Sequence, residues 1–283
     1  MTSPYLPAGE STVAVPAPGT GDGWWAGAPA AVHDPAGGLI VAWRERHGHD
    51  GFDRNVIARS PDGVTLETVL ELPAERFGAR WIERPALVAL PGGGWRLYVC
   101  LGYEGTKLWD IRTVTAPTLE GLAASAAASE RTLWADDTIG MKDPVVTRDH
   151  DGWHAVTCAH PLDITGAEDR MSSWAASSED GLDWIWDGIL LEGTAGSWDQ
   201  RGARFTSWLP DGTAAYDGRK SAEENWFERC GVARRVDDLR LAGASEPSAD
   251  IRYLTALEVD GGTRLWWEQR TPDGSHELRT ELV

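Results

Sequence analysis

Hydrophobic and polar positions follow one short pattern that returns roughly every 50–60 residues along the chain. An apolar strand-like run is followed by a Gly-containing turn, a second apolar run and a polar loop. The first runs begin at residues 28–32, 84–88, 143–146, 202–205 and 252–255, and their turns lie at 37–38, 92–94, 151–152, 211–212 and 261–262. Five hairpin-led units of this kind predict an all-β chain folded as a five-bladed β-propeller.

Each unit is expected to form one blade of four antiparallel strands. In the third unit these strands are predicted at 143–148, 153–159, 170–177 and 182–190, where apolar and polar residues alternate. A Ser-x-Asp-Gly turn precedes the fourth strand at 60–63 and again at 178–181. Asp-Gly favours the positive φ angle that a tight hairpin requires.

The repeats indicate a single domain over residues 1–283, because no Pro/Ser-rich linker or charge block divides the sequence. The last unit has only three evident runs, so residues 12–16 are expected to supply its fourth strand and close the ring. Residues 121–129, rich in Ala, are expected to form a short helix or an irregular excursion. The predicted blades are 24–75, 81–135, 141–192, 198–244, and 250–283 with 11–17.

Charge and composition narrow the partners. The chain has 26 Lys and Arg against 44 Asp and Glu, a formal charge of −18, which argues against nucleic acid and anionic membranes and favours a neutral or cationic partner. No signal peptide or membrane span is evident, so a cytoplasmic location is expected. Cys100, Cys158 and Cys230 lack metal or redox spacing and are expected to be buried thiols. Nothing predicts an oligomeric state.

Propeller geometry gathers polar residues at one axial opening. The starts of inner strands and the loops joining second to third strands lie on the same face of such a disc. Inner-strand starts in three successive units carry an acid at nearly the same station: Glu83, Asp143 and Asp199. The facing loops add further polar residues, among them His160, Asp217, Arg219, Glu224, Trp226 and Glu268. These residues are predicted to share one pocket.

A pocket with carboxylates, arginines and tryptophans suits a carbohydrate. Two carboxyl groups can divide acid and base roles, and a third can tune their pKa values. Tryptophan faces stack on sugar rings, and the chain has 16 Trp residues. Trp24 and Trp25 precede the first inner strand, where they form either a wall of the pocket or part of the core.

The repeat layout, the Trp-Ile-Glu-Arg-Pro start at 81–85, the Lys-Asp-Pro start at 142–144 and the Ser-x-Asp-Gly turns resemble the five-bladed propeller glycosidases of glycoside hydrolase families 43, 32, 62, 68 and 117. The resemblance implies that acids at inner-strand starts act as base or nucleophile, transition-state stabiliser and acid. Lys-Asp-Pro is similar to an Arg-Asp-Pro motif whose Asp is the stabiliser, which gives that role to Asp143. Glu83 matches the Glu-Arg-Pro start of some family 43 branches.

This chain departs from that pattern in its first unit, where residues 27–30 contain no acid. Glu83 and Asp143 are the favoured catalytic residues, and the third acid is either Asp199 or Glu224, with Asp217 behind them. Each has a structural alternative: Asp199 pairs with Arg201 or Arg204, and Glu224 caps the turn before Trp226. Arg84, Arg201, Arg219, Glu268 and His160 are predicted to bind substrate hydroxyls, or else to serve as ion-pair or loop residues.

The function predicted from these features is hydrolysis of short neutral oligosaccharides or glycosides, trimmed from one end. Two alternatives stay open. A carbohydrate phosphorylase needs cations for phosphate, for which Arg44, Arg46 and His47 are available. A propeller that binds carbohydrate without catalysis is compatible with the missing acid. No cofactor and no metal site is predicted, and a calcium or sodium ion in the central channel is not indicated.

Overall fold

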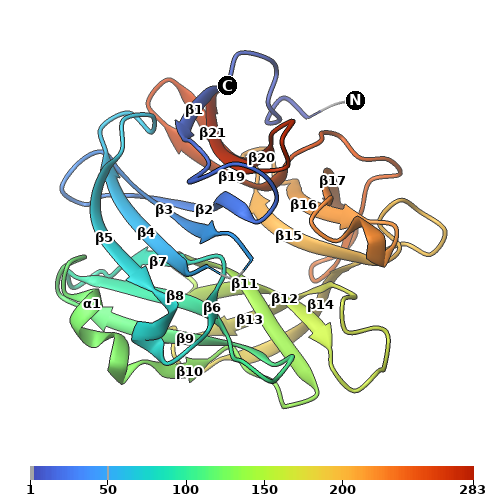
Figure 1. Cartoon of the computed structure of the whole chain (residues 1–283), viewed down its shortest axis with the longest axis horizontal. Coiled ribbons are helices and arrows are strands. Elements are labelled where there is room, and N and C mark those ends of the chain that lie inside the picture. The colour runs from blue at the N-terminus through green and yellow to red at the C-terminus, as the bar shows by residue number, and fades with distance from the viewer. Residues whose placement is uncertain (1–2, 50) are drawn as a thin grey trace.

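The computed structural model describes residues 3–49 and 51–283 and is an all-β fold. Sets of antiparallel strands follow one another around a common centre in chain order (Figure 1). No helix in the described ranges is long and apolar enough to cross a membrane.

Within each set the strands pair from the innermost strand outward. The first set contains β2 (Trp24–His33), β3 (Leu39–His47), β4 (Asp53–Ser60) and β5 (Glu67–Pro73). The second contains β6 (Trp81–Ile82), β7 (Ala86–Ala89), β8 (Trp95–Gly102), β9 (Trp109–Ala116) and β10 (Glu130–Thr132). Its inner strand is divided, since β6 and β7 both pair with β8.

The remaining sets have the same order. The third contains β11 (Ile139–Arg148), β12 (Trp153–Pro161), β13 (Ser172–Ser178) and β14 (Ile185–Glu192). The fourth contains β15 (Gly202–Trp208), β16 (Ala214–Arg219), β17 (Arg229–Arg235) and β18 (Leu241–Ala242), and the last contains β19 (Arg252–Val259), β20 (Gly262–Arg270) and β21 (His276–Leu282). Short helical turns occur at η1 (Ala74–Phe77), α1 (Leu122–Ser125), η2 (Ala126–Ala128) and η3 (Ala222–Glu224). The turns α1 and η2 confirm the short helix expected in residues 121–129.

The N-terminal strand β1 (Thr12–Val15) completes the last set. It pairs antiparallel with β21, with Thr12 opposite Thr280, as the sequence predicts for residues 12–16. A parallel bridge between Trp25 and His276 then links the last set to the first. Both chain ends are thereby tied to one sheet, and β21 is not left as an open edge.

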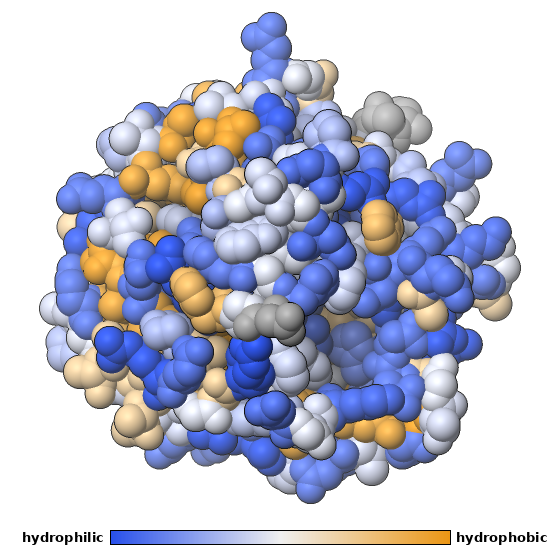
Figure 2. Space-filling view, in the orientation of Figure 1, coloured by the Kyte–Doolittle hydropathy of each residue, from blue (hydrophilic) through white to orange (hydrophobic). Residues whose placement is uncertain are grey.

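The hydrophobic core lies between neighbouring sets rather than in one block. Separate apolar clusters fill the spaces between successive sets, and the cluster between the last and first sets packs Trp266 and Leu278 against Trp43. The surface seen in Figure 2 is mainly hydrophilic with scattered apolar patches. Cys100, Cys158 and Cys230 are buried free thiols within these sheets. Packing of sheet against sheet therefore holds the sets around the centre.

The Ser-x-Asp-Gly turns have a structural role in this packing. In the turn at 60–63, Gly63 has φ 78° and donates its N–H to Ser60 Oγ at 2.8 Å. The Gly63 carbonyl accepts a hydrogen bond from Trp266 Nε1 of the neighbouring set at 2.9 Å. The Gly181 carbonyl likewise accepts from the Tyr98 hydroxyl at 2.7 Å. These turns fasten one set to the next and lie away from the centre.

The segment before β1 also contributes to the core, and this gives a first testable expectation. Leu6 is buried in the cluster that contains Leu209, Ile251 and Trp267. Leu6→Ala is expected to lower the free energy of unfolding by about 2–3 kcal/mol, because it leaves a cavity between packed sheets. Urea denaturation measures this loss. Val13→Ala, at an exposed position of β1, is the control and should change stability by about 0.5 kcal/mol or less. Equal effects of the two substitutions would contradict the packing role of Leu6.

Candidate functional site

One-residue bulges bend the inner strands where they approach the centre. In three sets the bulge follows a residue paired with the second strand: Gly27 with Arg44, Lys142 with Cys158, and Arg252 with Glu268. The next residue has a positive φ, 49° at Ala28, 52° at Asp143 and 53° at Tyr253. This conformation costs roughly 1–2 kcal/mol for a residue with a Cβ. Surrounding contacts must therefore hold Asp143 and Tyr253 in place.

The divided inner strand of the second set positions Glu83. Its backbone N–H donates to the Cys100 carbonyl of β8 at 2.9 Å. Glu83 is therefore paired with the second strand of its set in the same way as Lys142 is paired with Cys158 in the third set. Asp143 therefore lies one residue after the position equivalent to Glu83, and Asp199 lies before the first residue of β15, Gly202. The three acids do not occupy equivalent positions along their inner strands, although the sequence pattern placed them at nearly the same one.

A small cavity of about 50 Å³ lies at the centre of the molecule. Two carboxyl groups line it, Glu83 and Glu228, together with the aromatic side chains of Trp25, Trp226 and Tyr253. The other lining residues are Arg44, Lys142, His160, Met171, Arg204, Arg219, Asn225 and Arg252. Larger hollows of about 510 and 550 Å³ lie elsewhere, but turn residues and outer strands line them. The central cavity is the place where buried ionisable groups converge.

Glu83 is surrounded by cations. Arg44 donates to its carboxylate, the Arg46 guanidinium lies 3.4 Å away and the Lys142 ammonium 3.5 Å away. Its side chain is only 6% exposed. Burial raises the pKa of the Glu83 carboxyl, but the Arg44, Lys142 and Arg46 charges outweigh burial and hold this pKa well below its usual range. Glu83 is therefore an ionised carboxylate at neutral pH.

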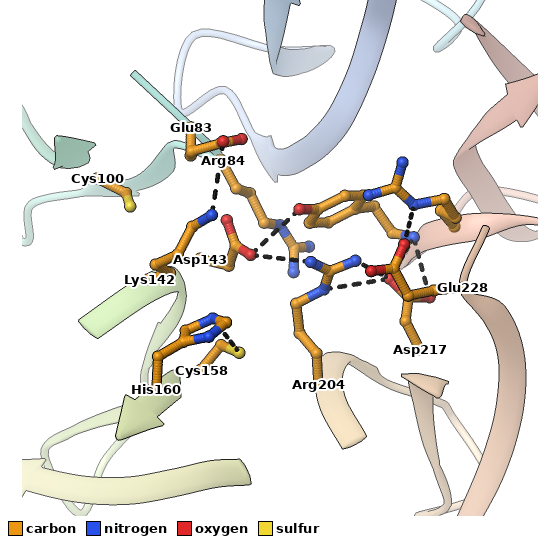
Figure 3. A network of polar contacts seen from close by, with 12 residues as sticks. Glu83, Arg84, Cys100, Lys142, Asp143, Cys158, His160, Arg204, Asp217 and Glu228 are labelled. Carbon is orange, nitrogen blue, oxygen red and sulfur yellow. Dashed lines mark hydrogen bonds and ion pairs between the residues drawn. The ribbon is translucent and has the colours of Figure 1, made fainter. Parts of the chain in front are cut away.

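Glu228 is the second carboxylate of the cavity. It lies directly before β17 and pairs with Arg219 at 2.9 Å and with Arg252 at 3.0 Å. Burial opposes its ionisation, but Arg252, Arg204 and Arg219 outweigh burial and lower the pKa of Glu228. In Figure 3, Asp143 and Arg204 lie between Glu83 and Glu228. The two ionised groups come from different sets and are connected by buried ion pairs, because Arg44 contacts both Glu83 and Glu268, and Arg252 contacts both Glu268 and Glu228.

Asp143, Arg204 and Asp217 form a second buried network between the two glutamates (Figure 3). Arg204 donates to Asp143 at 3.2 Å and to Asp217 at 2.7 Å, and the Tyr253 hydroxyl donates to Asp143 at 3.1 Å. Burial raises the pKa of Asp217, and Arg204 opposes this only in part. Asp143 and Asp217 do not line the cavity. They orient the guanidinium of Arg204, which does.

The other predicted site residues fall into three groups. Besides Glu83, the cavity is lined by Trp25, His160, Arg219 and Trp226. Glu268 is fully buried behind it and joins Arg44, Arg252 and His276. The remaining predicted residues do not line the cavity: Trp24, Arg84, Asp199, Arg201 and Glu224.

These five have other partners. Arg84 is turned toward the opposite end, where it donates to the carbonyls of Pro29 and Thr206. Asp199 accepts from the Tyr216 hydroxyl at 2.9 Å and from a loop N–H, so it pairs with neither Arg201 nor Arg204. The rest make local contacts: Trp24 packs on His47, Arg201 pairs with Asp169, and Glu224 accepts from the N–H of Lys220 and pairs with Arg229.

Sequence reasoning passed over Glu228, Arg204, Arg252, Tyr253 and Lys142 as site residues. Glu228 ends the loop between β16 and β17, the loop from which Glu224 was chosen. The sequence could have indicated Glu228 by its position directly before a strand, since residues at that position lie at the end of the sheet that faces the pocket. Arg252 and Lys142 likewise occupy the paired station before each bulge.

His160 is partly buried at the end of β12, and its titration gives a second expectation. Burial, with Lys142 and Arg219, lowers the pKa of His160 from 6.5 to about 3. The unfolded chain takes up this proton first, so the stability due to neutral His160 is present above pH 6.5 and is lost as the pH falls toward about 3. The lowered carboxyl pKa values of Glu83 and Glu228 add to the loss only below 4.5.

The unfolding free energy is therefore expected to fall between about pH 6.5 and pH 4.5, and His160→Gln should flatten this slope. Urea denaturation across this range measures it. His150→Gln, at a side chain that is 88% exposed, is the matched control and should keep the wild-type slope. An unchanged slope in the His160 variant would contradict the assignment.

Comparison with known proteins places the fold. No protein-family model and no curated protein sequence matches the chain. Among solved structures, a β-1,2-mannobiose phosphorylase from Listeria innocua is 13% identical, with 91% of this chain and 89% of that chain covered and a TM-score of 0.61. A thermostable family-43 glycoside hydrolase is 11% identical, with 91% and 89% covered and a TM-score of 0.67. A glycosyl hydrolase from Bacteroides ovatus is 13% identical, with 94% and 85% covered and a TM-score of 0.59. The chain shares the propeller fold of these proteins.

Proposed function

We propose that this chain is a single-domain, five-bladed β-propeller that hydrolyses glycosidic bonds in its central cavity. The observation that carries the proposal is the pair of ionised carboxylates, Glu83 and Glu228, that line one cavity together with Trp25 and Trp226. Two carboxyl groups from different elements are the minimum that glycoside hydrolysis needs. Aromatic faces beside them suit the C–H surface of a sugar.

The blade count rests on the strand sets and on their packing. Each of the sets led by β2, β7, β11, β15 and β19 is taken as one blade, and β1 completes the last. Apolar clusters between neighbouring sets fit blades packed face to face. One continuous ring of this kind is one domain.

The two carboxylates receive different roles. Glu83, held ionised by Arg44, Arg46 and Lys142, is assigned as the base that activates water or as the nucleophile. Glu228 is assigned as the acid, which must take up a proton against the lowered pKa set by Arg252, Arg204 and Arg219 before it can protonate the leaving oxygen. Asp143 is a positioning residue, because it acts through Arg204 and Tyr253. Proton NMR of the first product distinguishes inversion from retention of configuration.

The small cavity favours attack at a chain end. About 50 Å³ of space excludes an internal segment of a polymer, and because ligand pockets usually hold roughly 300 Å³ or more, lining side chains must move to admit even one terminal sugar residue. A neighbouring hollow of about 230 Å³, which shares Met171 with the cavity and includes Trp174 and Arg201, is available to the next residue. Short oligosaccharides or simple glycosides are the proposed substrates.

Release of 4-nitrophenol from a panel of α- and β-aryl glycosides tests the proposal. At least one glycoside should be cleaved, and substitution of Glu83 or Glu228 should slow the cleavage by about 10²-fold or more. No release from any member of the panel, with or without phosphate, would contradict an enzyme of this class and favour a protein that only binds carbohydrate.

Phosphorolysis is the second candidate, favoured by the cations of the cavity. Of the three residues that the sequence offered for phosphate, Arg44 lines the cavity, Arg46 pairs with Asp53 and Glu83, and His47 stacks on Phe52. Arg204, Arg219 and Arg252 add guanidinium groups. Cleavage that requires inorganic phosphate and yields a sugar 1-phosphate would establish this reaction in place of hydrolysis.

A further inference from the structure

The charge of the cavity lining is opposite in sign to that of the whole chain. Five cationic side chains line the cavity against two carboxylates, although the chain carries a formal charge of −18. The cations are Arg44, Lys142, Arg204, Arg219 and Arg252. The net charge of the chain favoured a neutral or cationic partner, but a ligand in the cavity contacts the lining residues, whose net charge is positive.

The acids that balance these cations lie behind them. Asp143, Asp217 and Glu268 are each 1% exposed or less and do not line the cavity. They pair with the far sides of Arg204, Arg252 and Arg44. This arrangement keeps the guanidinium groups charged and places the cations nearer the cavity than three of the acids that balance them, so a ligand in the cavity contacts more cationic than anionic groups.

Two cationic side chains of the lining have hydrogen-bond donors that lack a close acceptor. Arg219 Nε is buried without a partner. The Lys142 ammonium has one ion-pair contact among the described residues, 3.5 Å from Glu83, and lies 4.1 Å from the centre of the Trp109 ring. Lysine and arginine donate and never accept, so this cavity requires a ligand that supplies acceptors.

We propose, on the basis of the glycosidase function above, that the sugar residue bound in this cavity carries a carboxylate, so that the substrates are glycosides of uronic acids. A carboxylate offers acceptor sites only, and arginine forks match its planar geometry. A neutral hydroxymethyl group in the same place offers one acceptor oxygen instead of two and no charge to pair with Lys142 and Arg219. Buried charged donors that stay unpaired cost binding free energy.

Binding of free sugars tests this inference without requiring turnover. Isothermal titration calorimetry compares D-glucuronate with D-glucose and D-galacturonate with D-galactose, pairs that differ only at C6. One acid is expected to bind at least about tenfold more tightly than its neutral parent, as for a hydrogen bond to a charged group. Inorganic phosphate is titrated as a separate arm.

Lys142 is the residue to vary, because it is partly exposed and lies outside the fully buried ion pairs. Lys142→Gln is expected to reduce the acid-to-neutral preference about tenfold, and Lys142→Arg should keep most of it. Lys107→Gln, at a side chain that is 71% exposed, removes the same charge away from the cavity and should leave the preference unchanged.

The outcomes separate the two proposals. Equal or tighter binding of the neutral sugars overturns the uronic acid inference, and so does binding of phosphate without binding of either acid. Cleavage of neutral aryl glycosides without uronate binding leaves the glycosidase standing and removes this inference. Uronate binding that depends on Lys142, without cleavage of any aryl glycoside or uronide, supports this inference and contradicts hydrolysis.

Discussion

Glu83→Gln is expected to lower kcat/KM for the best aryl glycoside by about 10²- to 10⁴-fold, the range for loss of a catalytic acid or base. Glutamine keeps the shape of the side chain and its hydrogen-bond acceptor toward Arg44 but cannot accept a proton or attack carbon. The loss should appear mainly in kcat, since the charge acts on the transition state. Initial rates of 4-nitrophenol release measure it, with the folded fraction of each variant checked by near-ultraviolet circular dichroism.

Two comparisons make this result specific. Glu228→Gln should show a loss of similar size, because the two carboxylates act on the same bond. Glu75→Gln, at an exposed position in η1, should retain wild-type activity. Activity within about twofold of wild type in a folded Glu83 variant would remove Glu83 from the active site, since a catalytic carboxylate contributes far more than this.

Arg204→Met is expected to lower the free energy of unfolding by roughly 3–5 kcal/mol, the cost of breaking a buried ion pair on one side. Arg204 is the cation between Asp143 and Asp217, both of which are almost fully buried. It also lies 3.8 Å from the centre of the Tyr253 ring. Methionine fills much of the same space but leaves two carboxylates without their counter-charge. Urea denaturation at neutral pH measures the change.

An exposed arginine without such partners provides the control. Arg76→Met, in the exposed last turn of η1, should alter stability by about 0.5 kcal/mol or less. If Arg204→Met does not fold, Asp143→Asn gives the milder form, because it removes one charge and keeps the side-chain shape. Loss of less than about 1 kcal/mol in both variants would contradict the structural role of the buried network.

Much of the fold follows from local patterns in the chain. Alternation of apolar and polar residues located the strands of the third set within a few residues, and the unpaired last unit pointed to β1 as its partner. The Asp-Gly turns formed with the expected positive φ at Gly63 and Gly181. These features depend on residues close in sequence, or on the count of strands that a closed ring requires.

The candidate site was only partly accessible to the same reasoning. Glu83, Trp25, His160, Arg219 and Trp226 line the cavity as predicted, whereas Glu224 was named in place of Glu228. Both glutamates lie in one loop, and only the path of that loop decides which one faces the centre. Asp143 was expected at the pocket surface, but its left-handed backbone conformation turns it toward Arg204 and Tyr253.

The sequence alone thus predicted the strand positions, the turns and the pairing of β1 with the last set, because backbone pairing and apolar burial follow repeating local patterns. The sequence did not predict the charge of the side chains that line the cavity. Acids outnumber bases by 44 to 26 in the sequence, yet bulges one residue long leave Lys142 and Arg252 at the cavity and Asp143 behind it. Such a bulge changes which side chain faces the centre without changing the pattern of the strand, so only the packed tertiary structure decides it.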